Sequence, residues 1–213
     1  MYFSTAQCDE INKNELWART LSKTYFPLSA ECHNEAEFEG TLKSWSLGIL
    51  GLSEMECDGV LYHRRRTHFA NEKDSSLLIT IPHKGDVHFK QSSRDTKCPP
   101  GGFLVERGDM PYEFWHGKRN KLWVLKVPTA SVRSRLGATD RLGALTFDAT
   151  EGVGSFFVGA VRNTIHCVDQ INDVARDVAG QQLLDLLCLA MRSDDRILDS
   201  ASSTIRAAHL QRA

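Results

Sequence analysis

The sequence predicts an α+β protein in which a closed antiparallel β-structure, a barrel or sandwich, lies between an N-terminal helix and a C-terminal pair of helices. Three observations support this class. Helical periodicity occupies about residues 5–24, short turn-punctuated runs follow over about 35–128, and helical periodicity returns after residue 150. A length of 213 residues suits one such domain.

The N-terminal segment, residues 1–34, is predicted to be an arm and one amphipathic helix. Leu16, Trp17 and Leu21 form an apolar stripe behind a cap at Asp9. The helix should end at "FPLS", because proline disfavours helix in the residue before it.

Residues 35–149 are predicted to form the barrel. Short apolar runs alternate with turn residues; they are "WSLGILGLSEMEC", "GVLYHRRRTHF", "SSLLITIPH", "GDVHFKQ", "GGFLVER", "PYEFWH" and "KLWVLKV". In "LLITIPH", Leu78 and Thr80 alternate with Leu77 and Ile79, which predicts one wetter face. The segment "CPPGGFLVERGDMPYEF" places turn chemistry on both sides of a short strand, as a small closed barrel requires at its rim.

Residues 150–193 are predicted to form two helices that also make a dimer contact. Phe157, Val161 and Ile165 give the first helix one apolar stripe, and Asn172 or Asp173 caps the second. The second helix is apolar almost all round, so a two-fold contact should cover what the barrel leaves exposed. The alternative is that the first helix and the tail after Asp195 cover this surface fully. The residues expected at this contact are Leu183, Leu184, Leu187 and Met191, with Leu186 and Leu189 beside them.

Composition excludes several classes of protein. A net charge of −1 provides no basic field for nucleic acid or anionic membrane, and the local "HRRR" at 63–66 would point to both faces of a strand. Six scattered cysteines without a C-x-x-C pair indicate reduced thiols. We see no signal peptide, and "LLDLLCLAM" is too short to cross a membrane. We therefore expect a soluble, cytoplasmic protein with no membrane partner.

The order of these segments carries a family resemblance. "CPPGGFLVERGDMPYEF" resembles the corner of cupin barrels. Together with "EFEGTLKSWSLGILGLSEMEC", "RRRTH", "DSSLLITIPHKGDVHFKQ" and "KLWVLKVPTASV", it resembles the N-terminal effector-binding domain of AraC/XylS-type bacterial transcription regulators. The likeness covers most of residues 10–193, and the ordered set is more specific than any single motif.

The resemblance implies a cupin-like jelly-roll sensor barrel with a helical dimerisation element and no cofactor. It also implies a C-terminal pair of helix-turn-helix motifs, of which residues 194–213 match only the linker or first helix. The expected reading is a sensor fragment whose DNA-binding half is missing. Its expected partners are a small-molecule effector, a second copy of the chain and, through the missing half, promoter DNA, with RNA polymerase as a further partner of the full-length protein.

The effector is expected inside the barrel, against polar or aromatic side chains that face inward. The candidates are Trp123, Arg66, Lys84, Trp115, His63 and Glu113. By resemblance, Trp123 is an aromatic wall on the last strand. Plain core packing for Trp123 and solvent exposure for the charged residues remain open alternatives. Unpaired Arg66 and Lys84 favour a small aromatic or apolar effector that carries an acid or polar group.

Two other functions compete with this one. A metal-dependent cupin enzyme needs clustered histidines, but His83 and His88 flank a turn and the further expected histidine position is Leu104. No G-x-S-x-G motif or phosphate loop is present, so we expect no catalytic residue and no metal. The third reading is a barrel that serves only protein contacts.

Overall fold

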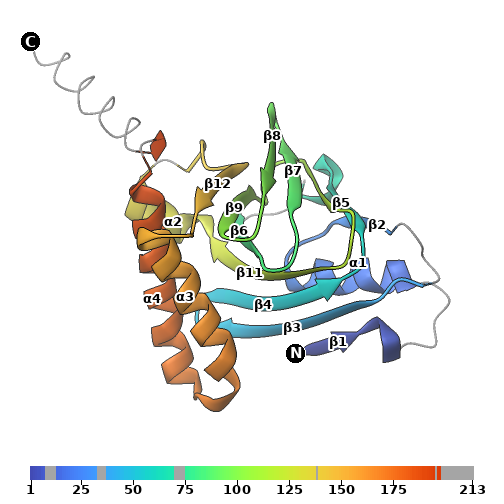
Figure 1. The fold of residues 1–213 in the computed structure, drawn as a ribbon, viewed down its shortest axis with the longest axis horizontal. Helices are drawn as coiled ribbons and strands as arrows, with labels where there is room; N and C mark the ends of the chain where they lie inside the picture. Colours follow the sequence, from blue (N-terminus) through green and yellow to red (C-terminus); the bar gives the residue numbers. More distant parts are fainter. Residues whose placement is uncertain (8–12, 33–36, 70–74, 138, 195, 198–213) are drawn as a thin grey trace, which may run out of the picture.

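The structure of this chain is a computed structural model that describes residues 1–7, 13–32, 37–69, 75–137, 139–194 and 196–197. Two antiparallel sheets lie face to face and form a jelly-roll-like barrel, and helices pack against it (Figure 1). The predicted α+β class with an antiparallel barrel is therefore confirmed. None of the helices in the described residues is long and apolar enough to cross a membrane.

The larger sheet has seven strands in the order β1-β3-β4-β11-β6-β9-β12. These strands are β1 (Tyr2–Ser4), β3 (Gly40–Leu47), β4 (Leu50–Cys57), β11 (Asn120–Pro128), β6 (Ser76–Pro82), β9 (Gly102–Arg107) and β12 (Leu145–Asp148). The smaller sheet has five strands in the order β2-β5-β10-β7-β8. They are β2 (Ser29–Cys32), β5 (Val60–Arg64), β10 (Tyr112–His116), β7 (Val87–Gln91) and β8 (Arg94–Cys98).

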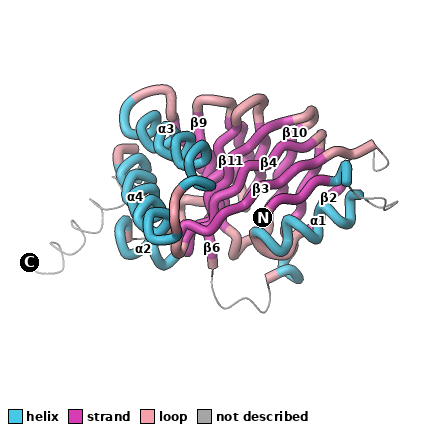
Figure 2. Tube along the Cα trace, turned by 90° about the horizontal axis from the view of Figure 1, so that it is seen from below, coloured by secondary structure: helices cyan, strands magenta, loops and turns pink. Residues whose placement is uncertain are grey.

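The four α-helices of the described residues occupy two places around the barrel. They are α1 (Lys13–Thr24), α2 (Thr129–Leu136), α3 (Gly152–Cys167) and α4 (Asp173–Arg192). Helices α2, α3 and α4 gather at one side of the sheets, and α1 lies at the other (Figure 2). As predicted, Asn172 caps α4, because its side-chain oxygen accepts a hydrogen bond from the Ala175 amide.

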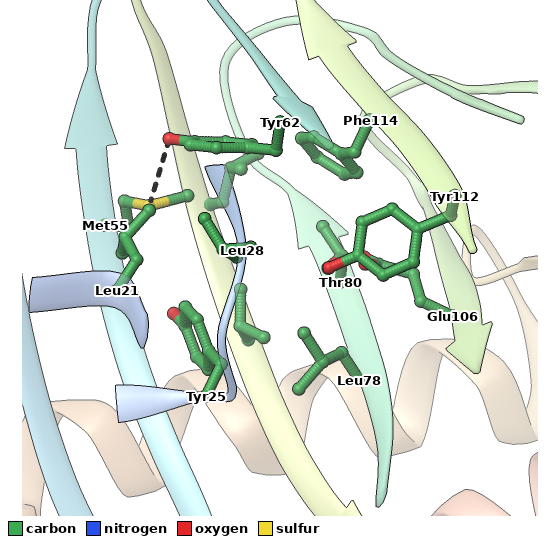
Figure 3. Close-up of a pocket in the computed structure, with 12 residues that line it drawn as sticks. Leu21, Tyr25, Leu28, Met55, Tyr62, Leu78, Thr80, Glu106, Tyr112 and Phe114 are labelled. Atoms are coloured by element: carbon green, nitrogen blue, oxygen red, sulfur yellow. Dashed lines mark hydrogen bonds between the residues drawn. The ribbon is translucent and has the colours of Figure 1, made fainter. Parts of the chain in front are cut away.

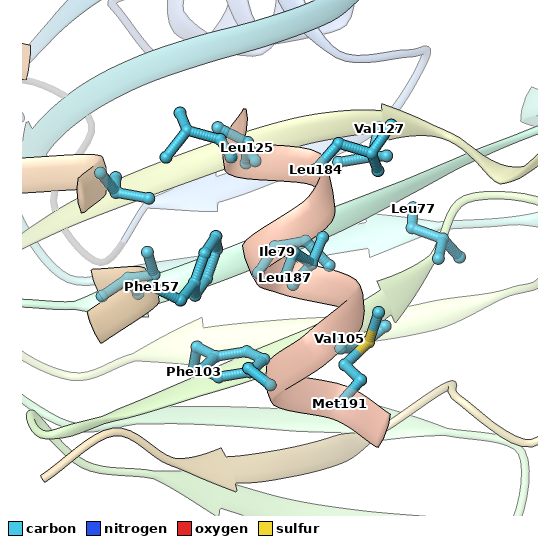
Figure 4. Packing of buried hydrophobic residues seen from close by; sticks show 14 of the residues in the cluster. Leu77, Ile79, Phe103, Val105, Leu125, Val127, Phe157, Leu184, Leu187 and Met191 are labelled. Carbon is cyan, nitrogen blue, oxygen red and sulfur yellow. The ribbon is translucent and has the colours of Figure 1, made fainter. Parts of the chain in front are cut away.

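Strand β6 of the larger sheet is buried on both faces, so the wetter face expected for "LLITIPH" is wrong. Leu77 and Ile79 face α3 and α4, while Leu78 and Thr80 face the barrel interior, and all four are at most 4% exposed. The two hydrophobic cores therefore share a sheet: one fills the barrel, and the other lies between the sheet and the helices (Figure 4).

Helix α4 buries its apolar side chains inside the monomer. Leu183, Leu184, Leu187 and Met191 are at most 2% exposed and point at the sheet, as Figure 4 shows for the last three. The expectation that these residues form a dimer contact is wrong on geometry, because the sheet and α3 already cover them. Helix α4 comes so close to β3 that a Cβ at Gly180 would lie 2.2 Å from the Leu47 carbonyl oxygen.

Several element boundaries differ from the prediction. "WSLGILGLSEMEC" is a hairpin of two strands that turns at Gly48 with φ of 64°. "GVLYHRRRTHF" leaves the sheet after Arg64, and Arg66 begins a 3-10 turn, η2 (Arg66–His68). Strand β8 occupies a stretch expected to be a turn. The cap expected at Asp9 and the tail after Ile197 lie outside the described residues.

Candidate functional site

The barrel interior contains a cavity that is apolar on most sides. Its free volume is about 30 Å³, enough for one or two water molecules. The lining comes from α1, the segment after it and both sheets (Figure 3), and consists of Leu21, Tyr25, Leu28, Met55, Tyr62, Leu78, Thr80, Glu106, Tyr112, Phe114, Leu122 and Val124. We call this cavity the lumen.

A polar cluster lies on one wall of the lumen. Glu106 of β9 is 3% exposed, and its Oε1 accepts a hydrogen bond from the Thr80 hydroxyl of the neighbouring strand β6. Burial raises the pKa of the Glu106 carboxyl to about 8, so this group is mostly protonated at neutral pH. Tyr112 of β10 reaches in from the opposite sheet. Burial is the main cause that raises the pKa of its hydroxyl, and the nearby Glu106 carboxyl raises it further. The cluster offers hydrogen-bonding groups to a molecule in an otherwise apolar site.

Tyr25 separates the lumen from a groove on the surface. The Ser53 hydroxyl donates to the Val124 carbonyl at 3.3 Å, so the Tyr25 hydroxyl donates to Ser53 at 2.6 Å. Tyr25 also lines a surface groove of about 300 Å³, together with Met1, Trp45 and Ser53. Tyr25 therefore belongs to the walls of both the lumen and the groove.

Helix α1 is tied to the lumen at a second point. Trp17 is fully buried, and its Nε1 donates to the Tyr62 hydroxyl at 2.9 Å. The Tyr62 ring in turn lies 5.9 Å from the ring of Phe114, another lumen residue. Side chains of the lumen wall are thus in direct contact with α1.

Trp123 is buried, but it lies outside the barrel. It belongs to the core between the larger sheet and the helices, where its Nε1 donates to Glu54 at 3.1 Å. Its ring lies 4.8 Å from His83 and 5.7 Å from the guanidinium of Arg162 on α3. The expected inward orientation of Trp123 is wrong because its neighbours Leu122 and Val124 take the inward positions of β11.

The candidates on the smaller sheet also face outward. On β10 the buried set is Tyr112, Phe114 and His116, which puts Glu113 and Trp115 on the outer face. His63 of β5 is on the same outer face and lies 3.8 Å from Glu113. Trp115 stacks on the ring of His88 at 5.2 Å. The inward orientation expected for His63, Glu113 and Trp115 is wrong by one step of the strand alternation.

The two basic candidates lie away from the lumen. Arg66 is exposed in the 3-10 turn η2. Lys84 is exposed in the turn after β6, and its Nζ lies 2.9 Å from Glu56 Oε1. Neither can neutralise a ligand inside the barrel, so the basis for an acidic effector disappears.

Sequence reasoning missed the polar residues of the lumen. A usable signal is present in "GFLVER", because Leu104 and Glu106 alternate with Phe103 and Val105 and share one face. An acid on a strand buried on both faces is unusual enough to mark a site. Tyr25 carries no such signal, since its place depends on the turn that follows α1.

The histidines that a cupin metal site would need do not converge. Over the described residues, no group of three His, Cys, Asp or Glu side chains could hold a metal ion. His83 and His88 contact different tryptophans, and Leu104 packs in the core of the barrel.

Comparisons with known proteins place this architecture among regulators. Residues 17–192 match the family model described as the AraC-binding-like domain. An uncharacterized protein in the nit 5' region of Bacillus sp. (strain OxB-1) is 20% identical over 188 residues, 88% of this chain and 73% of that protein.

Two solved structures give the extent of the structural likeness. The AraC-like transcriptional activator CuxR has a TM-score of 0.76 at 14% identity, over 89% of this chain and 69% of that chain. The Cupin_2 domain of an XRE family regulator from Enterobacter cloacae has a TM-score of 0.34 at 10% identity, over 41% of this chain and 95% of that chain. The similarity to CuxR shows a shared fold.

Proposed function

Since this chain belongs to the AraC-binding-like domain family, we propose that it is the ligand-sensing domain of a bacterial transcription regulator and binds a small aromatic or apolar effector inside its barrel. The observation that carries this proposal is the lumen itself. Leucine, methionine and aromatic side chains surround a buried cluster of Glu106, Thr80 and Tyr112. Ligand sites are built in this way, with apolar walls and a few polar groups that fix orientation. The role is sensing rather than catalysis.

Binding of an effector requires the lumen to open. Its volume of about 30 Å³ is far below the several hundred Å³ of a typical ligand pocket. Movement of Tyr25 toward the groove of about 300 Å³ would supply both a path and space. Because Tyr25 and Trp17 tie α1 to the lumen, such a movement would shift α1. Displacement of α1 is thus the proposed output of effector binding.

We further propose that the domain forms a homodimer through the outer faces of α3 and α4. Phe156, Val174, Val178 and Leu189 are each 49–73% exposed, which is unusual for apolar side chains on one helical layer. A two-fold contact between like helices would bury them. The regulator would then act in the cytoplasm on promoter DNA, through a helix-turn-helix domain, and on RNA polymerase.

The methionine side chains allow a direct test of the lumen. Met55 lines it, whereas Met191 is buried in the separate core between sheet and helices and serves as an internal control. With ¹³C-labelled methionine methyl groups, titration with small apolar molecules such as indole and benzyl alcohol should shift the Met55 resonance and leave Met191 nearly unchanged. Equal shifts of both resonances, or none with any probe of a broad panel, would refute the lumen as the effector site.

A further inference from the structure

We propose that the lumen selects effectors that carry a protonated amine on an apolar body, and that Glu106 is the residue that binds the amine. This inference rests on the proposed function, since it takes the lumen as the effector site. Glu106 projects from the middle of β9 into the cavity, and Thr80 is the group that hydrogen-bonds its carboxyl. A fully buried carboxyl is costly to keep in a fold, and such groups are concentrated at functional sites.

The groups that face Glu106 cannot neutralise its charge. They are Tyr112 on β10, Tyr25 after α1 and Cys98 on β8, and burial raises the pKa of all three, so they are neutral at pH 7. None of the described residues that line the lumen is basic. The carboxyl of Glu106 is therefore the single ionisable acid among these groups that can be charged near neutral pH.

Two basic residues near the lumen are engaged elsewhere. The Arg64 guanidinium donates to the carbonyl oxygens of Pro27 and Gly108 and lies 4.0 Å from the Phe26 ring. The Lys126 ammonium donates to the carbonyl oxygen of Tyr25. Both cations are held by backbone carbonyls and neither lines the lumen, whereas the Glu106 carboxyl does. A cationic ligand in the lumen would therefore meet a carboxyl, and an anionic ligand would have no cation in direct contact.

Binding of an ammonium should displace the proton of Glu106. The ligand keeps its own proton, Glu106 releases one proton to solvent, and an N⁺–H···O⁻ pair forms between them. Such charge-assisted bonds are shorter and about twice as strong as neutral ones. With a carboxyl pKa of about 8, roughly nine in ten free molecules carry this proton at pH 7. Affinity should therefore rise nearly tenfold per pH unit below pH 8 and level off above it, up to the pH at which the amine itself loses its proton.

The test uses three probes of matched shape: benzylamine, benzyl alcohol and benzoate. Calorimetry at pH 7 and pH 8, each in two buffers of different ionisation enthalpy, measures affinity and proton release together. We expect benzylamine to bind at least tenfold more tightly than benzyl alcohol at pH 8 and to release close to one proton at pH 7. Benzoate should bind most weakly.

Two variants assign the effect to Glu106. Glu106→Gln should keep binding of benzyl alcohol and lose both the preference for benzylamine and the proton release. Glu113→Gln, which changes an exposed carboxyl on the outer face of the smaller sheet, should behave as the wild type. The proton release needs only the wild-type protein, so it tests the proposal even if Glu106→Gln fails to fold.

The outcomes separate this inference from the proposed function. If benzyl alcohol shifts Met55 but benzylamine binds no more tightly, or if Glu106→Gln keeps the preference, the lumen remains the effector site and the amine inference is overturned. If none of the three probes reaches Met55, the proposed function fails and the inference fails with it.

Discussion

Replacement of Glu106 by glutamine should remove a pH-dependent loss of stability that the wild-type protein carries. The ordinary pKa of a glutamate is 4.5, and burial raises that of Glu106 to about 8 in the folded state. Between these values the folded protein keeps a proton that the unfolded chain has released. Stability is therefore retained at low pH and falls as pH rises toward 8.

The size of this effect follows from the two pKa values. One pKa unit corresponds to about 1.4 kcal/mol, so the linkage costs the wild type about 4 kcal/mol of unfolding free energy between pH 5 and pH 9. Urea unfolding of wild type and Glu106→Gln, followed by tryptophan fluorescence across that range, measures the difference between the two proteins. Other titrating groups cancel in this difference, and Glu113→Gln serves as the exposed control.

The difference in unfolding free energy should widen steadily in favour of Glu106→Gln as pH rises, and it should level off above pH 8. A difference that is flat with pH would show that the Glu106 carboxyl titrates in the ordinary range. That result would remove the buried carboxyl from the account of the lumen.

Four further substitutions test other parts of the structure. Tyr25→Phe removes the hydrogen bond to Ser53, so urea unfolding should show a loss of about 1 kcal/mol in unfolding free energy. Stopped-flow mixing should show faster entry of probes into the lumen. An unchanged rate of entry would refute the proposal that Tyr25 controls access to the lumen. Leu187→Glu buries a charge in the core and should unfold the domain. Leu189→Glu, on the exposed face of α4, should instead give a folded monomer in sedimentation. If the Leu189→Glu variant is still a dimer, the dimer contact lies elsewhere. Trp123→Ala should cost about 3–5 kcal/mol of stability and leave the affinity of the folded protein for a probe unchanged. A large loss of affinity would show that Trp123 belongs to the binding site.

The sequence predicted the fold class because its strongest signals are local. The alternation in "LLITIPH" and the cap at Asn172 depend on neighbouring residues, and both elements form where expected. Strand β8 was missed because its "RDTKC" is polar, and its outer residues face solvent at the edge of the smaller sheet. Pairing with β7 makes it a strand, and pairing is a tertiary property.

The inward orientation of most candidate residues was predicted wrongly, because strand alternation fixes two faces without saying which is inside. In "PYEFWH", Glu113 and Trp115 form one face and Tyr112 and Phe114 the other, and both contain an aromatic ring. Trp123 is harder still, since β11 is buried on both faces around it and burial gives no direction. The two faces of the larger sheet are distinguished only by the packing of α3 and α4 on one of them.

A crystal structure with a bound probe tests the central claim most directly, that the lumen is the effector site. We expect density for the probe inside the barrel, in contact with Met55 and Glu106, and the Tyr25 side chain displaced toward the surface groove. Density confined to the surface near Trp123 and Arg162, with a lumen unchanged at about 30 Å³, would contradict the account.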